Sequence, residues 1–164
     1  MQRIAKFEKV GFEQFRESFS GENVEKVYDG IKLPKRATTG SAGYDFFLTE
    51  DVVLAPGQTA LIPTGIRVRI DEGWMLQLYP RSGLGFKFRL QLNNTVGIID
   101  SDYYFSKNEG HIFCKITNDS KDGKTVELKE GDAFCQGIFV PFGITVDDET
   151  HALRDGGFGS TDKK

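Results

Sequence analysis

Two closely spaced carboxylates, Asp100 and Asp102, follow the apolar stretch 96–99 and precede two tyrosines, Tyr103 and Tyr104. In a strand, residues two apart point to the same face, so the two acids would lie side by side. Neighbouring carboxylates repel, so they are either separated by solvent or used in a site, where one could act as a general base that activates water. A solvated loop after a buried strand is the alternative interpretation.

The segment 80–87, PRSGLGFK, combines glycines with charged and hydroxyl side chains. Gly83 and Gly85 let backbone N–H groups approach a ligand closely, while Ser82 adds a hydroxyl and Arg81 a positive charge. This mixture suits a phosphate or another anion, although neither the Walker spacing nor GxGxxG is present. An ordinary strand-to-helix turn explains the pattern equally well.

Two further segments of this kind lie towards the ends of the chain. Asp45, within AGYDF (42–46), is either a turn cap or a carboxylate near a metal-bound ligand. In the tail RDGGFGST (154–161), Phe158 lies between glycines and could stack on a base, unless the tail is simply disordered. The tail residues suited to phosphate contact are Arg154, Ser160 and Thr161. Together the segments predict a site for a small anionic ligand with an aromatic ring, attacked by water.

Composition excludes several classes of protein. The chain has 164 residues, the size of one domain, with 21 Lys and Arg against 24 Asp and Glu, hence a net charge of −3. That balance argues against a nucleic-acid surface. No apolar run reaches the roughly 18 residues of a membrane span, and residues 1–10 do not resemble a secretory signal. Cys114 and Cys135 do not make a disulfide scaffold, and His111 and His151 are expected to be structural or surface residues. We expect a reduced, cytoplasmic setting.

The elements that must position these residues are mainly strands. From residue 42 onward, apolar and polar residues alternate, which is typical of half-buried strands. The alternating stretches are 66–70, 74–79 and 112–117, and the turn signals between strands lie at 56–57, 71–73, 122–123 and 130–132. Many short strands with regular turns predict a sandwich, jelly roll or barrel.

The first thirty residues have a different pattern. Phe12, Phe15 and Phe19 repeat with the spacing of one helix face, which predicts a short amphipathic helix over Gly11 to Ser20, followed by a charged connector through residue 30. This segment is either a packing appendage or a surface that docks a partner. We therefore divide the chain into an N-terminal appendage (1–32), a core (33–146) and a flexible tail (147–164).

Five ordered segments carry a resemblance to a known family, the trimeric dUTP nucleotidohydrolases (dUTPases). The segments are 42–46, 80–87, 94–104, 131–142 and 154–161, and the match runs from about Leu33 to the C-terminus. The resemblance implies a distorted jelly-roll β-barrel that forms a homotrimer with shared active sites. It also implies Mg²⁺-dependent hydrolysis of dUTP to dUMP and pyrophosphate, which limits uracil incorporation into DNA.

Site residues follow from the resemblance position by position. Asp100 would deprotonate the water that attacks the α-phosphorus, and Asp45 would act on Mg²⁺ through water, the ion being held mainly by substrate phosphates. The residues implied for uracil and deoxyribose are Asn94, Gly97, Ile99, Tyr103 and Phe158. Those implied for phosphate are Arg81, Ser82, Gly83, Gln136, Arg154, Ser160 and Thr161. The tail would come from a neighbouring subunit.

The sequence departs from the family's pattern in three places. Residues 105–110 intervene after Tyr103 where the family has Tyr-x-Gly, Ala133 stands where an Arg is usual, and the fifth motif is shorter and carries Asp162 in place of Gly. Two other functions are consistent with the chain: a dCTP deaminase of the same fold, and a nucleotide-sensing binder whose N-terminal helix docks a regulatory partner. The resemblance points to a bacterial or bacteriophage-like protein.

Overall fold

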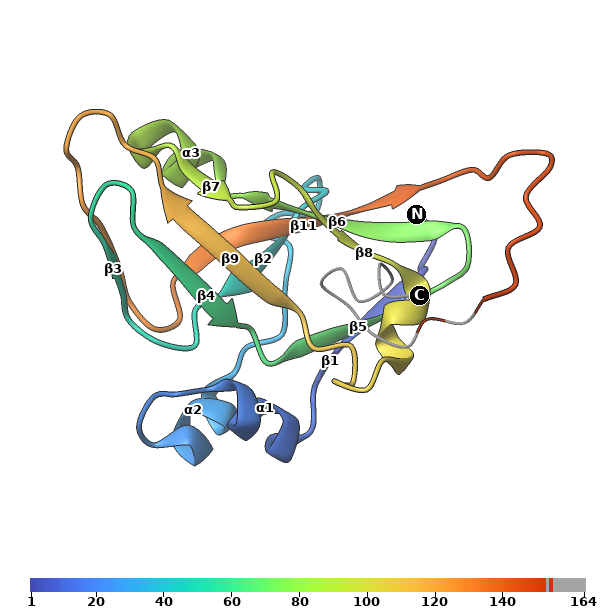
Figure 1. Ribbon diagram of the computed structural model, residues 1–164, viewed down its shortest axis with the longest axis horizontal. Coiled ribbons are helices and arrows are strands. Elements are labelled where there is room, and N and C mark those ends of the chain that lie inside the picture. The colour runs from blue at the N-terminus through green and yellow to red at the C-terminus, as the bar shows by residue number, and fades with distance from the viewer. Residues whose placement is uncertain (153, 155–164) are drawn as a thin grey trace.

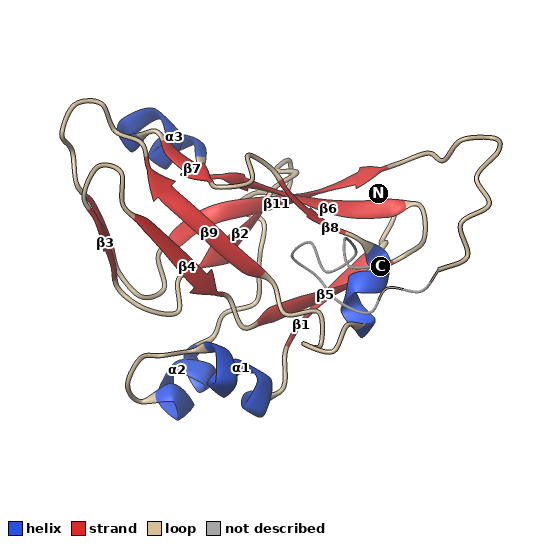
Figure 2. Ribbon diagram, viewed as in Figure 1, coloured by secondary structure: helices blue, strands red, loops and turns tan. Residues whose placement is uncertain are grey.

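The computed structural model describes residues 1–152 and 154, in which short antiparallel strands surround one main hydrophobic core (Figures 1 and 2). The strands are β1 (Ala5–Lys9), β2 (Tyr44–Phe47), β3 (Val52–Leu54), β4 (Thr59–Pro63), β5 (Ile66–Ile70), β6 (Trp74–Pro80), β7 (Leu90–Leu92), β8 (Gly97–Ile99), β9 (Phe113–Asn118), β10 (Val126–Leu128) and β11 (Ala133–Pro141). The helices are α1 (Phe12–Ser18), α2 (Val24–Gly30), α3 (Ser82–Phe88) and the 3-10 helix η1 (Ser101–Phe105).

Two larger sheets enclose the core. One has the strand order β2-β11-β6-β8 and the other β4-β9-β7, while β1 pairs with β5 and β3 with β10. Leu76 and Leu78 from the first sheet and Ile62 and Ile116 from the second belong to the same buried cluster. Burial of apolar surface between the sheets is the main stabilising contribution to such a fold. The prediction of a mainly β, distorted jelly-roll barrel is confirmed.

The predicted alternation is also confirmed. On β5, Ile66, Val68 and Ile70 are buried while Arg67 and Arg69 are not. On β6, Leu76 and Leu78 are buried and their neighbours are only partly covered. The alternating residues therefore divide into a set that faces the core and a set that faces outward. This division determines which side chains of β6 lie on each face of its sheet.

The N-terminal segment differs from its expected form. The predicted helix is present as α1, but the expected connector contains a second helix, α2, and residues 5–9 form a strand that pairs antiparallel with β5. Val10, Phe15 and Phe19 make a small second core against α2. Two of the three phenylalanines of the predicted face, Phe15 and Phe19, are buried, whereas Phe12 is only partly buried. The boundary at residue 32 stays a prediction.

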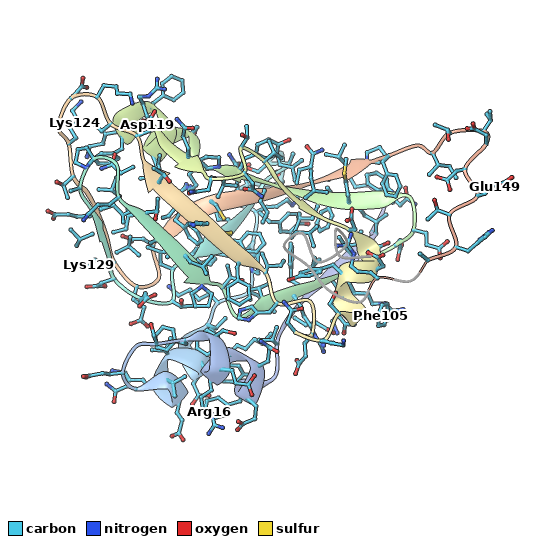
Figure 3. The ribbon with its side chains drawn as sticks, in the orientation of Figure 1. Arg16, Phe105, Asp119, Lys124, Lys129 and Glu149 are labelled. Carbon is cyan, nitrogen blue, oxygen red and sulfur yellow. The ribbon has the colours of Figure 1, made fainter. Side chains whose placement is uncertain are left out.

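No helix in the described part of the chain combines the length and the apolar character needed to cross a bilayer. After β11 the chain continues to residue 152 without a helix or strand. The charged residues Asp119, Lys124 and Lys129 lie at the end of the molecule opposite Phe105 of η1 (Figure 3). Their ion pairs therefore belong to a surface remote from the segment that carries the paired carboxylates.

Candidate active site

A cavity of about 160 Å³ lies beside β8 and η1. The third motif supplies most of its lining, because β8 pairs with β6 and ends where the carboxylates begin. The predicted site residues on this cavity are Asn94, Gly97, Ile99, Asp100, Tyr103 and Arg154. The structure thus brings together the residues expected for the base, the sugar and the attacking water, with one cation among them.

The two acids are not in a strand. β8 ends at Ile99, Asp100 precedes η1 in an extended conformation, and Asp102 is in the first turn of that helix. They are nevertheless held together, because the Arg154 guanidinium pairs with Asp100 through Nη2 and with Asp102 through Nε, the latter at 2.8 Å. Arg154 therefore lies on the carboxylates in this chain, and not beside the segment 80–87.

Tyr103 is buried in the wall of the same cavity. Its hydroxyl donates to the His111 carbonyl at 2.8 Å and accepts from Asn108 Nδ2 at 2.8 Å. Burial raises the pKa of this phenol, so the ring stays neutral at physiological pH. Sequence reasoning missed Asn108, although an amide side chain within the inserted loop 105–110 was a visible signal. As expected, His111 is structural: it is fully buried and its Nε2 accepts from the Gly65 backbone N–H at 2.9 Å.

A second group of predicted residues gathers where β6 ends, around Tyr79 and the start of α3. Gln136 on β11 lies opposite Tyr79 on one side and Asp45 of β2 on the other. Arg81, which precedes α3, pairs with Asp45 at 3.3 Å between Nε and Oδ1. A groove of about 590 Å³ runs past these strands and is lined by Arg81, Ser82 and Gln136, among others.

The strand β2 approaches this group closely because Gly43 has no side chain. A Cβ at Gly43 would lie 2.5 Å from Gln136 Oε1, so a larger residue there would force the glutamine amide to turn away. The glycine of the first motif therefore makes room for the glutamine of the fourth. Gly83, by contrast, has open space around its Cα, so its backbone is accessible to a ligand.

The two groups lie on opposite faces of one sheet. Leu78 of β6, which pairs with Gly97, lines the cavity beside Asp100, whereas the next residue, Tyr79, pairs with Gln136 and lines the groove beside Ser82. Because consecutive residues of a strand point to opposite faces, the two groups line separate pockets in a single chain. The predicted site residues thus form two half-sites.

Three predicted residues, Phe158, Ser160 and Thr161, lie outside the described residues. Among the residues that the structure does describe, no three His, Cys, Asp or Glu side chains gather as a metal site. Cys114 and Cys135 are buried free thiols, and burial raises the pKa of Cys135 well above its ordinary value. Neither thiol is therefore suited to act as a nucleophile.

A jelly-roll barrel with five ordered glycine-rich motifs and two half-sites defines a class of nucleotide-binding proteins. Comparison with known proteins identifies the family within that class. The family model for dUTPase matches residues 29–162, more than half of the chain. This chain belongs to the dUTPase family.

Curated relatives and solved structures agree with that assignment. The deoxyuridine 5'-triphosphate nucleotidohydrolase of Lactococcus lactis is 44% identical over 80% of this chain and 89% of its own length. That of Tolumonas auensis is 41% identical over 83% of this chain and 91% of its own. The crystal structure of dUTPase from Streptococcus mutans superimposes with a TM-score of 0.65 at 36% identity, covering 85% of this chain and 97% of that one. A dUTPase from phage phi11 of S. aureus, described with a structural Mg(II) ion, has a TM-score of 0.66 at 23% identity over 92% and 98% of the two chains, a likeness of fold.

Proposed function

We propose that this protein hydrolyses dUTP to dUMP and pyrophosphate and so limits the incorporation of uracil into DNA. The observation that carries the proposal is the cavity beside η1, where a carboxylate, a buried tyrosine and an asparagine from one motif meet. The chain's membership of the dUTPase family supports the same reaction.

Asp100 is the general base in this proposal. Its carboxylate accepts a proton from a water molecule whose oxygen attacks the α-phosphorus. The bond from the α-phosphorus to the bridging oxygen breaks, and pyrophosphate leaves with that oxygen. Arg154 now pairs with Asp100, but a guanidinium binds phosphate with the same paired geometry as carboxylate. When substrate binds, Arg154 can therefore leave Asp100 and pair with the triphosphate. Asp100 is then free to act as the base.

Residues that line the same cavity bind the nucleoside in this proposal. Asn94 with the backbone of Gly97 and Ile99 reads the uracil edge, and Tyr103 packs under the deoxyribose, where a 2′-hydroxyl would be crowded. Phe158 stacks on the base. The partial burial of this cavity favours such stacking and hydrogen bonding, because water competes less there.

The second half-site binds the phosphates in this proposal, through Arg81, Ser82, Gly83 and Gln136. The γ-phosphate is contacted by Arg154, Ser160 and Thr161. The position of Asp45, on the outer face beside Gln136, suits an acceptor for water bound to Mg²⁺. Mg²⁺ bound with the substrate neutralises charge on the triphosphate. A phage dUTPase with a similar fold is described with a structural Mg(II) ion.

The separation of the half-sites supports an oligomer with shared active sites, which we propose is a homotrimer. The Asp100 cavity of one subunit must meet the Ser82 and Gln136 face of another before one nucleotide can contact both. The part of the tail beyond Arg154, which carries Phe158, would extend to a neighbouring subunit. Sedimentation at several protein concentrations tests this, and an active monomer would contradict it.

The substrate is tested by pyrophosphate release from dUTP, dCTP, dTTP and UTP, each with Mg²⁺ and with EDTA. We expect release from dUTP alone, and only with Mg²⁺. Ammonia release from dCTP would instead identify a deaminase.

The role of Asp100 is tested by Asp100→Asn, which should reduce turnover by about 10² to 10⁴, the usual contribution of a general base. Asp102→Asn is the matched control, since Asp102 also pairs with Arg154 but abstracts no proton in the proposed reaction. We expect that control to change turnover by less than about tenfold, because half-exposed ion pairs contribute little. Equal losses in the two variants would contradict the assignment.

A further inference from the structure

The loop that follows Tyr103 links the candidate site to the N-terminal strand. Tyr103 is buried in the wall of the cavity, whereas the next residue, Tyr104, lies against β1. There the Tyr104 hydroxyl donates to Glu8 Oε2 at 2.6 Å. This hydrogen bond lowers the pKa of Glu8, after a larger effect from Lys6, and raises the pKa of Tyr104. A hydrogen bond to an ionised acceptor is stronger than one between neutral groups.

The same loop makes a second contact with the N-terminal segment. The Gly11 backbone N–H, at the start of α1, donates to Glu109 Oε2 at 2.7 Å. Arg67 of β5 lies between the two contacts, with its guanidinium 4.5 Å from the centre of the Tyr104 ring. It is also 3.7 Å from Glu8 Oε2 through Nε and 3.8 Å from Glu109 Oε2 through Nη1. One partly buried cation thus joins β1, β5 and the loop.

The loop is too tightly packed for Tyr104 to move independently of Tyr103. Gly110 has a φ of +70°, and a Cβ there would lie 2.7 Å from Tyr104 Cα and 2.8 Å from the Tyr103 carbonyl oxygen. The returning chain therefore passes so close to the backbone of both tyrosines that a side chain at residue 110 would not fit. Asn108, in the same return, holds the Tyr103 hydroxyl at 2.8 Å. A displacement of Tyr104 from β1 would shift the Tyr103 ring in the cavity.

We propose that Glu8 and Tyr104 are positioning residues for Tyr103, through which the N-terminal strand helps to select deoxyribose over ribose. The inference rests on the proposed function, in which Tyr103 packs under the sugar. It gives a role to both the N-terminal strand and the loop 105–110 in the candidate reaction. Neither residue touches substrate in this proposal.

The test compares Tyr104→Phe with the wild-type protein. This change removes the hydroxyl that Glu8 accepts and keeps the ring under Arg67. The readout is the ratio of kcat/KM for dUTP to kcat/KM for UTP, which loss of stability alone does not move. A hydrogen bond to a charged group is worth about a factor of ten or more in an equilibrium, and Tyr104 acts on the sugar only through Tyr103. We therefore expect the smaller fall of about threefold to tenfold in the ratio.

Tyr28→Phe is the matched control. Tyr28 is in the same N-terminal segment, and its hydroxyl donates to the Val10 carbonyl at 2.7 Å, so the change removes a hydrogen bond of this segment but neither partner of the Tyr104–Glu8 hydrogen bond. We expect that variant to lose stability without a change in the ratio. Glu8→Gln is the second variant, and it weakens the same hydrogen bond by removing the charge of the acceptor. The double variant should lower the ratio no further than Tyr104→Phe alone, because that change already removes the hydrogen bond.

A ratio that falls in Tyr104→Phe and Glu8→Gln but not in Tyr28→Phe supports the inference. An unchanged ratio in both Tyr104→Phe and Glu8→Gln overturns it while leaving the proposed function intact. An equal fall in Tyr28→Phe also overturns it, since the effect would then come from the whole segment. A wild-type protein that releases no pyrophosphate from dUTP refutes the proposed function itself, and the inference with it.

Discussion

Protonation of His111 should make the folded protein sensitive to mild acid. The ring is fully buried, and its Nε2 must stay unprotonated to accept the hydrogen bond from the Gly65 N–H. Burial lowers the pKa of His111 from 6.5 to about 4. The unfolded chain therefore binds a proton on this residue at a higher pH than the folded protein does. Stability from this group is complete above pH 6.5, falls as the pH falls, and is constant again below about pH 4.

The size of the effect follows from the separation of the two pKa values. One pKa unit corresponds to about 1.4 kcal/mol, so the full loss is about 3 kcal/mol. Roughly 2 kcal/mol of it should be gone at pH 5. Carboxylates whose pKa is lowered in the fold, such as Asp51 and Asp119, lose their contribution only at more acidic pH.

Urea unfolding at a fixed protein concentration, repeated at steps from pH 7.5 to pH 4, measures the loss. His111→Gln is the control, because the amide oxygen can accept the Gly65 N–H while the side chain cannot titrate. We expect the free energy of unfolding of the wild-type protein to fall by about 2 kcal/mol more than that of the variant between pH 7.5 and pH 5. Parallel curves for the two proteins would refute the reasoning, since His111 would then titrate equally in both states.

Three other outcomes follow from the structure. Phe15→Ala should cost about 3–5 kcal/mol of stability, because Phe15 is fully buried in the small core with α2, and thermal unfolding measures it. Arg81→Gln should raise the KM for dUTP about tenfold or more by removing a charged phosphate contact, and an unchanged KM in steady-state assays would exclude that contact. Cys135 should react with a thiol reagent only after unfolding, because burial raises its pKa, and labelling rates with and without urea test this.

The local sequence pattern was enough to predict the strands that surround the site. In β5, the alternation of Ile66, Val68 and Ile70 with arginines is a local signal, since one face of the strand is buried and the other is not. At η1, the prediction from alternation was incomplete. Asp100 and Asp102 lie after the end of β8, and Arg154, more than fifty residues away in the sequence, pairs with both of them. Sequence spacing cannot reveal a contact of that range.

The N-terminal segment shows the other limit. The strand Ala5–Lys9 has weak alternation of its own, and it is a strand because β5 offers its free edge to it. The helix Val24–Gly30 carries several charges, and Val24, Val27 and Tyr28 pack on the small core only after α1 has supplied Phe15. Tertiary contacts of this kind override local propensity.

By itself, the sequence determined the residue types available for chemistry, their order in five motifs and the period-two strands that carry them, because these depend on neighbours along the chain. Only the tertiary structure decided how those residues divide between the two faces of the sheet. Strand pairing places Asp100 and Tyr103 on one face of a sheet and Ser82 and Gln136 on the other, and it brings Glu8 to the loop after Tyr103. The reason is that register and sheet order are set by burial of the whole core, which no single segment encodes.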